Sequence, residues 1–388
     1  MYNSKNILFI CHDSNRSGAP LYLLSLIKWL SANKTFNLNV LFTESGPLVS
    51  DFKKYSNILI YNKSFSEALN IPNSFRFLTW ILNNRLSQKI YLQNFKKTLA
   101  SQKIDLIYSN TITNGFLVNL LLPKNIPIIT HVHESEYQIN LYGKDNLNHV
   151  LSHTQKYIAC SKHVINNLVS NLMIEKSKVH LIYSSIMAGD LGKPKMIESL
   201  EKKFKGKIVV GASGSLDWRK GYDLVIPLIR ELLKFNSSYH FIWIGINKNS
   251  LEYEQLQFEI EKSGLSNEIT LIENTSSPID YYSYLDYFVL LSREDSFPLV
   301  CLELTLMGKP IFCFKNSGGA CELLVDIPHN IIDYLDVGNI AKQINFIDKE
   351  KKLQSEIVNR LKIRVSENYL SENNFNDVYN LISDTLNL

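Results

Sequence analysis

Apolar residues gather along the chain in short runs that alternate with longer amphipathic stretches. In the first half, runs rich in β-branched and aromatic residues cover residues 6–11, 39–42, 105–110, 127–132 and 157–160. In the second half, they cover residues 208–213, 240–245, 269–272, 287–291 and 310–314. Continuous apolar strands that alternate with helices are typical of parallel sheets covered on both faces. The pattern therefore predicts an α/β fold with two doubly wound domains.

A polar, basic segment separates the two halves. Residues 187–207 carry Gly and Pro near their start and are interpreted as a linker or a surface helix. We therefore predict one domain at 1–190 and a second at 191–388, and a length of 388 residues also favours two domains. Residues 371–388 have the apolar spacing of a helix, which is expected to stay with the second domain or to pack back on the first.

Composition and charge exclude several classes of protein. Hydrophobic residues make up 45% of the chain and charged residues 20%, which is ordinary for a globular protein with large cores. The formal net charge of +4 is too small to indicate a nucleic-acid binder, which would concentrate basic residues. Five cysteines without a C-x-x-C pair fit poorly with a disulfide framework. We interpret them as small buried hydrophobic residues.

The expected location is cytoplasmic, because neither a signal peptide nor an apolar run of about 18 residues is found in the sequence. One stretch leaves open a peripheral contact with the inner face of the membrane. Residues 75–100 mix aromatic residues with five basic ones: Arg76, Arg85, Lys89, Lys96 and Lys97. They fit a patch that faces anionic lipid, or an ordinary amphipathic helix with long basic side chains at its surface.

The first strand is followed by a segment that could bind an anion. Ser17, Gly18 and Ala19 form a small-residue loop, and an apolar helical run starts near Pro20. The start of a helix behind such a loop offers free N–H groups to a phosphate. A tight turn without a ligand explains the segment equally well. The G-x-G-x-x-G fingerprint is absent, which removes the main support for a nicotinamide cofactor.

The second half has a similar segment after its first strand. Gly214 follows that strand, and Arg219 and Lys220 come just before a helical run. Two cations beside a helix N-terminus are unfavourable unless an anion lies between them, which favours a phosphate or diphosphate ligand. The alternative is a solvated basic turn that is paired with Asp217 or Asp223.

Two histidines lie at the end of the strand 127–132. Alternation along a strand sends His131 and His133 to the same side, with His133 beyond the last apolar residue. His133 can donate or accept a hydrogen bond near neutral pH. Glu134 and Glu136 are close, but the spacing matches no zinc pattern, so no metal is predicted.

A charged residue interrupts the apolar run that starts at Pro298. Glu303 lies one to two turns inside the predicted helix, and Asp295 lies just before it. Free N–H groups of residues 296–299 provide an anion site between the two carboxylates. This arrangement suits a diphosphate with hydroxyl-rich groups at both ends, because carboxylates accept hydroxyl hydrogen bonds. The alternative for Glu303 is an ion pair with a Lys or Arg in the core.

These segments, in this order, resemble the retaining glycosyltransferases of family 4, which have the GT-B fold of two Rossmann-like domains facing each other across a cleft. The most specific part is residues 292–310, which look like that family's two acidic residues separated by seven positions, here Asp295 and Glu303. The family often has Glu at the first of these positions, and often has Arg where this chain has Ser215. The resemblance spans most of the chain, from Ser17 to residue 324.

The resemblance implies a function and a set of site residues. The chain would be a metal-independent hexosyltransferase without a cofactor. It would move a sugar from a nucleotide diphosphate to a glycan or lipid-linked acceptor with retention, in bacterial surface polysaccharide biosynthesis. Glu303 would hold the ribose, Asp295 the sugar, Lys220 and Arg219 the diphosphate, and His133 would line the cleft near the reacting sugar. The remaining predicted donor-binding residues are Gly18, Ala19, Ser213, Gly214, Ser296, Phe297, Pro298 and Leu299.

Rival functions remain. A sugar-nucleotide epimerase with the GT-B fold is the nearest enzyme. A non-catalytic partner subunit that keeps the fold and binds glycan or another transferase belongs to a different class, and a nicotinamide dehydrogenase ranks third. The joint presence of Asp295, Glu303, Arg219 and Lys220 argues against a non-catalytic subunit.

Overall fold

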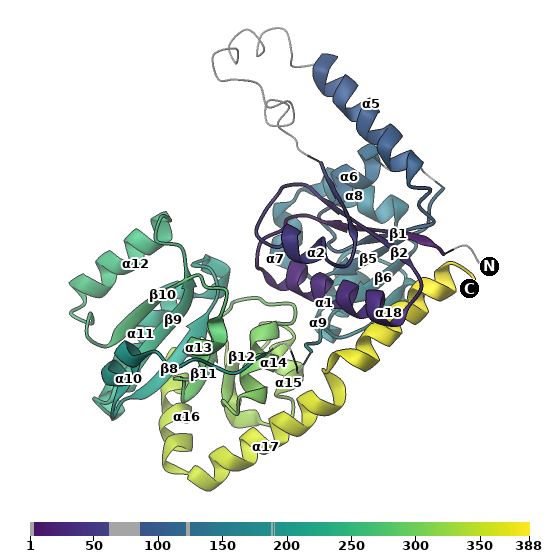
Figure 1. The fold of residues 1–388 in the computed structure, drawn as a ribbon. Coiled ribbons are helices and arrows are strands. Elements are labelled where there is room, and N and C mark those ends of the chain that lie inside the picture. Colours follow the sequence, from purple (N-terminus) through teal and green to yellow (C-terminus); the bar gives the residue numbers. More distant parts are fainter. Residues whose placement is uncertain (1–3, 62–85, 122–124, 188, 190) are drawn as a thin grey trace, which may run out of the picture. The chain divides into compact units, whose positions relative to one another are not determined.

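The computed structural model describes residues 4–61, 86–121, 125–187, 189 and 191–388 (Figure 1). The chain forms two compact units. The first comprises Met1–Cys160, Val164–Ile182 and Phe375–Leu388, and the second comprises Ser161–His163 and Tyr183–Asn374. Relative to the predicted division at 190/191, residues 161–163 and 183–190 thus group with the second unit and residues 375–388 with the first.

The first unit contains a parallel sheet of seven strands in the order β3-β2-β1-β4-β5-β6-β7. Its strands are β1 (Asn6–Cys11), β2 (Asn37–Phe42), β3 (Asn57–Ile60), β4 (Leu106–Ser109), β5 (Ile128–Val132), β6 (Lys156–Ala159) and β7 (Val179–Leu181). The five strands predicted in this half are confirmed to within two residues at each end. The interior strand β1 is buried on both faces, because Ile7 to Cys11 are all 0% exposed.

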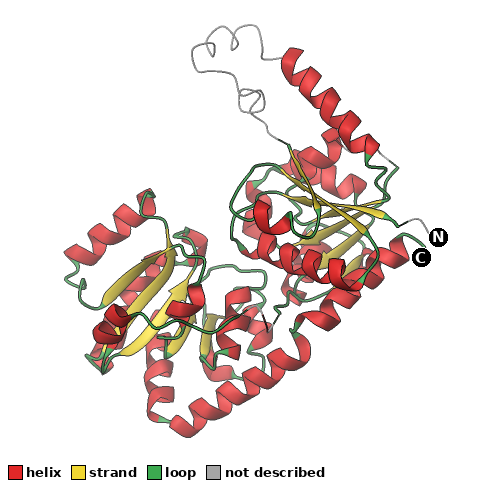
Figure 2. Cartoon of the chain, in the orientation of Figure 1, coloured by secondary structure: helices red, strands yellow, loops and turns green. Residues whose placement is uncertain are grey.

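Helices lie on both sides of this sheet (Figure 2). They are α1 (Gly18–Asn33), α2 (Val49–Phe52), α5 (Leu86–Ser101), α6 (Gly115–Leu121), α7 (Glu136–Leu141), α8 (Lys144–His153), α9 (Lys162–Asn166) and α18 (Ser371–Thr385). On one face, Phe95 of α5 packs in the cluster that contains Leu8 of β1. On the other, Tyr22 of α1 meets the His131 ring of β5 at 5.0 Å and the Phe375 ring of α18 at 5.6 Å.

The second unit contains a parallel sheet of six strands in the order β10-β9-β8-β11-β12-β13. Its strands are β8 (Ile208–Ser213), β9 (Tyr239–Ile246), β10 (Ile269–Glu273), β11 (Tyr287–Leu290), β12 (Ile311–Phe314) and β13 (Ile331–Ile332). Its helices are α10 (Glu198–Phe204), α11 (Val225–Phe235), α12 (Leu251–Lys262), α13 (Pro278–Tyr282), α14 (Leu299–Leu306), α15 (Ala320–Leu323), α16 (Val337–Lys349) and α17 (Lys351–Asn368). The two sheets confirm the predicted α/β class.

Three strands were not predicted, and all three lie at sheet edges: β3, β7 and β13. Their side chains are half-buried or exposed along most of their length, and β13 has only two residues. An edge strand packs against one neighbour only, so it does not need the continuous apolar run that marks an interior strand.

The stretch 75–100 is only partly described. Arg76 and Arg85 lie outside the described residues, and the described part forms α5. Phe95 and Leu99 are buried, whereas Lys96 and Lys97 are exposed, which is the pattern of an ordinary amphipathic helix. Among the helices that the structure describes, none is both long enough and apolar enough to cross a bilayer.

Candidate functional site

The site of the second unit is built on an ion pair between Lys220 and Asp295. Lys220 Nζ lies 2.5 Å from Asp295 Oδ2, and the two side chains are 20% and 10% exposed. Asp295 follows β11, and Lys220 ends the 3-10 turn Trp218–Lys220. Gly221 follows with a φ of 76°, and a Cβ there would clash with the Leu291 carbonyl oxygen. Glycine therefore lets this turn pack directly against the end of β11.

The position of the two predicted cations differs from the prediction. We expected Arg219 and Lys220 to adjoin the N-terminus of an α-helix, but a second 3-10 turn, Tyr222–Leu224, separates them from α11. The Asp217 side chain accepts the N–H of Arg219 at 2.7 Å and so caps the first turn. The cations are thus held by a capped turn, and the repulsion that we expected between them and an α-helix dipole does not apply to them.

Arginines join this turn to the segment after β11. Arg219 Nη1 donates to the Glu294 carbonyl oxygen at 2.8 Å, and its Nε is buried without a hydrogen-bond partner among the described residues. Arg293 forms a bidentate pair with Asp223 at 2.8 and 2.7 Å, and its guanidinium stacks on the Trp218 ring at 4.5 Å. Asp223 is therefore engaged by Arg293, and the alternative in which it pairs with Arg219 or Lys220 is wrong.

The backbone of Asp295 is fixed by the loop that follows β12. The Asp295 N–H donates to the Ser317 carbonyl oxygen at 2.7 Å, and the Gly319 N–H donates to the Asp295 carbonyl oxygen at 3.1 Å. Gly318 has a φ of 128°, and a Cβ there would clash with the same Asp295 oxygen. Only glycine permits this approach, so Gly318 helps to set the position of the Asp295 carboxylate.

Glu303 lies on α14 and is partly exposed. Within the described part of the chain, its carboxylate takes part in no hydrogen bond and no ion pair. Burial raises the pKa of Glu303 to about 7, and no interaction with the described residues opposes this rise. The alternative of an ion pair with a core Lys or Arg is therefore wrong for these residues, and the carboxylate is left with its full capacity to accept hydrogen bonds.

Cys301 shows that these charged groups are close together. Its thiol is 1% exposed, and its pKa is raised first by burial and then by the charge of Asp295; the charge of Glu303 adds to the rise and that of Lys220 opposes it. Tyr282 Oη lies 2.9 Å from Ser213 Oγ, and the charge of Glu303 helps burial to raise its pKa. The charges of Asp295, Lys220 and Glu303 thus all act on the pKa of the buried Cys301 thiol.

The remaining residues predicted in this unit lie in three different places: beside Lys220, in the core and at the start of α14. Gly214 has a φ of 140°, and the Lys220 stem passes 3.6 Å from where its Cβ would lie. Phe297 is 6% exposed, with its ring 5.5 Å from Tyr183 and 5.1 Å from Tyr369, so its side chain belongs to the core. Three predicted residues lie at the start of α14, where Ser296 precedes the buried Pro298 at the N-cap and Leu299 begins the helix.

Several residues of this site were missed in the sequence. Gly221 and Gly318 could have been found, because glycines that follow a basic pair or a strand often mark close backbone approach. Arg293 and Tyr282 carry no such signal, since their partners are distant along the chain. Cys301 was assigned to the core, and it is buried there as expected.

In the first unit, His133 leaves the carboxyl end of β5. Its ring packs on that of His131 with the centroids 3.9 Å apart, as strand alternation predicts. Burial, with a smaller contribution from the charge of His12, lowers the pKa of His133 to about 3. His133 Nε2 lies 3.2 Å from Asn110 Oδ1. A neutral imidazole can exchange hydrogen bonds with a hydroxyl group but cannot supply charge.

Asn110 connects His133 to the start of α1. Its Nδ2 donates to the Ala19 carbonyl oxygen at 2.9 Å. Gly18 and Ala19 form the first turn of α1, two residues earlier than the predicted helix start, so they are not in a loop. In the described residues, Ser17 provides no side-chain cap and no acidic residue occupies the first turn. The N–H groups at this end are thus available to an anion, and a Cβ added to Gly18 would have open space.

Glu134 is buried beside His133 but differs from Glu303. It accepts hydrogen bonds from the Thr111 hydroxyl, from the Ile112 N–H at 3.3 Å and from the His133 N–H at 3.1 Å. Glu134 therefore fixes the backbone around β4 and β5. Over the described ranges, no group of three or more His, Cys, Asp and Glu side chains is arranged to hold a metal ion.

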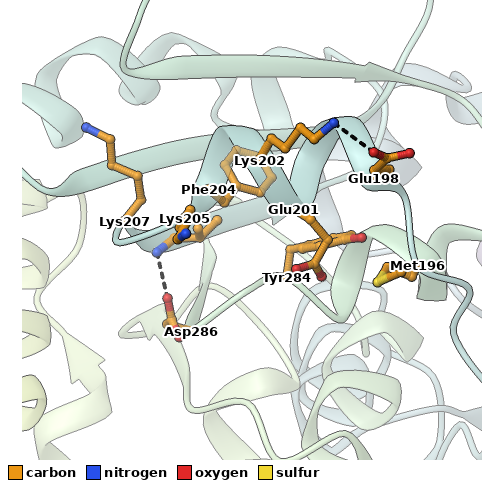
Figure 3. Close-up of a pocket in the computed structure, with 10 residues that line it drawn as sticks. Met196, Glu198, Glu201, Lys202, Phe204, Lys205, Lys207, Tyr284 and Asp286 are labelled. Atoms are coloured by element: carbon orange, nitrogen blue, oxygen red, sulfur yellow. Dashed lines mark hydrogen bonds and ion pairs between the residues drawn. The ribbon is translucent and has the colours of Figure 1, made fainter.

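A hollow of about 590 Å³ lies near the amino ends of strands in the second sheet (Figure 3). It is lined by α10 and by residues near the starts of β8 and β11, where Asp286 accepts the Val209 N–H at 2.8 Å. Ligands of open parallel sheets bind at the carboxyl ends of the strands. The residues that line this hollow include none of the predicted site residues, and we do not assign the donor site to it.

Comparisons with known proteins identify the family and the fold. Residues 17–186 match the model of the family described as Glycosyltransferase Family 4, and residues 195–364 match that of Glycosyl transferases group 1. The O-antigen biosynthesis glycosyltransferase WclY of Escherichia coli is 25% identical over 225 residues, covering 54% of this chain and 61% of that protein. The capsular polysaccharide biosynthesis glycosyltransferase CapM of Staphylococcus aureus is 20% identical over 224 residues, 55% of this chain and 58% of CapM. The chain thus spans about six tenths of the length of these curated relatives.

Solved structures share the fold over nearly the whole chain. Anabaena HepE, in complex with UDP and glucose, has a TM-score of 0.79 at 19% identity, covering 98% of this chain and 100% of that one. The sucrose-phosphate synthase of Thermosynechococcus elongatus has a TM-score of 0.76 at 15% identity, covering 98% of each chain. The predicted GT-B fold is confirmed. With both of its halves matched by family models of this class, the chain belongs to the group 1 glycosyltransferases.

Proposed function

We propose that this chain transfers a sugar from a nucleotide diphosphate sugar to a glycan or lipid-linked acceptor in bacterial surface polysaccharide biosynthesis. The transfer would retain the anomeric configuration, need no metal and take place in the cytoplasm. The observation that carries the proposal is the Glu303 carboxylate, which has a raised pKa and lacks a partner in the described residues. Such a group destabilises the free protein, so it is expected where a ligand uses it.

Each charged group has a role that follows from its chemistry. The ribose of the donor has two neighbouring hydroxyl groups, which donate well to a carboxylate such as Glu303. Lys220 and Arg219 balance the diphosphate, whose negative charge grows as the bond to the sugar breaks. Arg219 Nε, which has no hydrogen-bond partner among the residues that the structure describes, supports this role, because a buried N–H without an acceptor favours a ligand that supplies one.

The Lys220–Asp295 pair suggests how diphosphate and sugar are recognised together. A diphosphate that draws Lys220 to itself competes with the Asp295 carboxylate, which lies 2.5 Å from Lys220 Nζ. Once released from Lys220, Asp295 is able to accept hydroxyl hydrogen bonds from the sugar. The position of Asp295 is kept meanwhile by its backbone bonds to Ser317 and Gly319.

His133 receives a separate proposal within the first unit. Its neutral imidazole would exchange a hydrogen bond with a substrate hydroxyl, while Asn110 keeps the ring in place. We expect His133→Ala to lower kcat while the affinity for the bare nucleoside diphosphate stays within about twofold. An equal loss in kcat and in the affinity for the nucleoside diphosphate would instead show that His133 supports the folded structure at the carboxyl end of β5.

The test measures thermal shift and calorimetric affinity with a panel of sugar nucleotides and nucleoside diphosphates. Glu303→Gln is compared with Glu294→Gln, a control variant that makes the same change at the glutamate preceding Asp295 in the sequence. Stabilisation of the wild type by one nucleotide, lost in Glu303→Gln and kept in Glu294→Gln, would support the donor site. A folded wild type that no nucleotide stabilises would refute it and would favour a non-catalytic subunit.

Turnover then separates a transferase from its nearest rival. A transferase releases free nucleoside diphosphate in proportion to the acceptor that is supplied. An epimerase converts the donor without an acceptor. Analysis of the anomeric configuration of the product by NMR tests retention, and activity after treatment with a chelator tests metal independence.

A further inference from the structure

Two thiols in the second unit lie within reach of each other. Cys313 Sγ on β12 and Cys321 Sγ on α15 are 3.8 Å apart. A disulfide has an S–S length of about 2.0 Å, so the sulfur atoms would have to approach by roughly 1.8 Å. The neighbouring backbone is the loop of residues 315–319, which holds Asp295 in the proposed donor site.

The two thiols differ in environment. Cys313 is 0% exposed and lies on a strand paired on both sides, opposite Leu290 and Ile331. Cys321 is partly exposed. Its contact with the Cys313 thiol lowers the pKa of Cys321 to about 7, and backbone hydrogen bonds from Asn316 and Ser317 contribute further lowering against the effect of burial. Cys321 is therefore the accessible thiolate, and Cys313 is the fixed partner.

Closing the sulfur–sulfur gap has a consequence for Asp295. Because Cys313 is held within the sheet, Cys321 has to move, and its thiol then leaves the Phe314 carbonyl oxygen, to which it donates at 3.2 Å. Cys321 lies two residues after Gly319, whose N–H donates to the Asp295 and Ser296 carbonyl oxygens at 3.1 Å each. A Cβ on Gly318 or Gly319 would clash with those oxygens, so the two backbone segments are packed in direct contact. A movement of the backbone at Cys321 would therefore be transmitted to Asp295.

We propose that Cys313 and Cys321 form a reversible disulfide that weakens donor binding by displacing the 315–319 loop from Asp295. The statement about donor binding rests on the proposed function, whereas disulfide formation does not. With hydrogen peroxide as the oxidant, the Cys321 thiolate attacks one oxygen, and the O–O bond breaks to give a sulfenic acid and hydroxide, which is protonated to water. Cys313 then attacks the Cys321 sulfur, the S–S bond forms and a second water leaves. Two thiols are oxidised and one peroxide is reduced.

The experiment uses the full chain, reduced or treated with hydrogen peroxide. Mass spectrometry of an unreduced digest is expected to show a peptide pair joined through Cys313 and Cys321, with Cys11, Cys160 and Cys301 still alkylated as thiols. Hydrogen exchange is expected to show the Asp295 amide exchanging at least about tenfold faster after oxidation, because it loses its bond to the Ser317 carbonyl oxygen. The affinity for the sugar nucleotide that binds best is expected to fall at least about tenfold and to return with dithiothreitol.

Two variants control the result. Cys321→Ser and Cys313→Val both remove the disulfide, and two different positions guard against a variant that fails to fold. Either folded variant should keep its affinity under peroxide. A wild type that forms no such bond, or that forms it without a change in Asp295 exchange and in affinity, overturns the proposal. A reduced chain that binds no sugar nucleotide overturns the proposed function. In that case, comparing hydrogen exchange at the Asp295 amide before and after oxidation still decides whether the disulfide displaces the loop of residues 315–319.

Discussion

Replacing Glu303 by Gln should stabilise the free protein at pH 8. Burial moves the pKa of Glu303 from 4.5 to about 7. Each pKa unit corresponds to about 1.36 kcal/mol, so the ionised carboxylate costs the folded state on the order of 3 kcal/mol. Because the folded-state pKa is the higher one, the folded chain binds the proton more tightly than the unfolded chain does. The cost is therefore absent below pH 4.5, grows as the pH rises to 7 and is complete above it.

The assay is denaturant unfolding of wild type and Glu303→Gln at pH 4.5 and pH 8. Two units can unfold in separate transitions, so the free energy is taken from the transition that the substitution moves. We expect a gain of about 2–3 kcal/mol at pH 8 and almost none at pH 4.5. Glu322→Gln is the matched control. The Glu322 carboxylate accepts the Lys162 N–H at 3.2 Å, the His163 N–H at 3.0 Å and the Tyr183 hydroxyl at 2.9 Å, and its replacement should destabilise by about 1–3 kcal/mol at pH 8.

The same pKa predicts the pH dependence of donor binding. Ribose hydroxyls donate to the ionised carboxylate, so affinity follows the ionised fraction of Glu303. With a pKa of about 7, that fraction is about one tenth at pH 6 and about nine tenths at pH 8. Sugar-nucleotide affinity should therefore rise nearly tenfold from pH 6 to pH 8, and Glu303→Gln should bind weakly at both. A variant that is less stable than wild type at pH 8, or a flat pH profile in wild type, would refute the reasoning.

Three further predictions concern the surroundings of Asp295. Asp295→Asn removes the ion-pair partner of Lys220, so the bare nucleoside diphosphate should bind several-fold tighter when measured by calorimetry. The additional affinity that the sugar of the donor provides should disappear. Equal losses of affinity for the nucleoside diphosphate and the sugar nucleotide would contradict this. Gly318→Ala should lower the free energy of unfolding by about 1–3 kcal/mol, because a φ of 128° and the adjacent Asp295 carbonyl oxygen leave no room for a Cβ. The loss is measured as a lower melting temperature, and an unchanged melting temperature would contradict the close approach. Arg293→Lys should weaken nucleoside diphosphate binding by about five- to tenfold in titrations. It loses the bidentate pair with Asp223 and the stacking on Trp218, which together hold the turn that carries Lys220. Unchanged binding would show that the turn needs no such support.

The interior of both sheets could be predicted from sequence because a buried parallel strand has to be apolar at every position. β1 and β8 were found with their observed bounds. The edge strands β3, β7 and β13 could not be predicted, because β3 and β7 have no buried residue and β13 has only two residues. The edge strand β10 was found, because its residues form an apolar run. Strand alternation also predicted that His131 and His133 lie on one side, because that relation depends only on neighbouring residues.

The parts of the site that could be predicted are local in sequence. Asp295 and Glu303 stand out because a carboxylate in or beside an apolar run is unusual. The ion pair of Asp295 with Lys220, 75 residues away, and the backbone bond of Asp295 to Ser317 depend on which strands lie side by side. We expected Lys220 to adjoin the start of a helix, but α11 begins at Val225, because Gly221 adopts a left-handed conformation and two 3-10 turns precede the helix. No local pattern distinguishes such a turn from the start of a helix.

Glu134 and Glu303 show why the hydrogen bonds of a carboxylate separate a structural role from a functional one. Burial raises the pKa of both Glu134 and Glu303, so neither burial nor the direction of the pKa shift tells them apart. Glu134 accepts three hydrogen bonds that tie β4 to β5, and its charge is used by the fold. Glu303 accepts none from the described residues, so the fold gains nothing from its charge there. A ligand with neighbouring hydroxyl groups would offset that cost, and for this reason Glu303→Gln should gain stability and lose donor binding while Glu134→Gln loses stability.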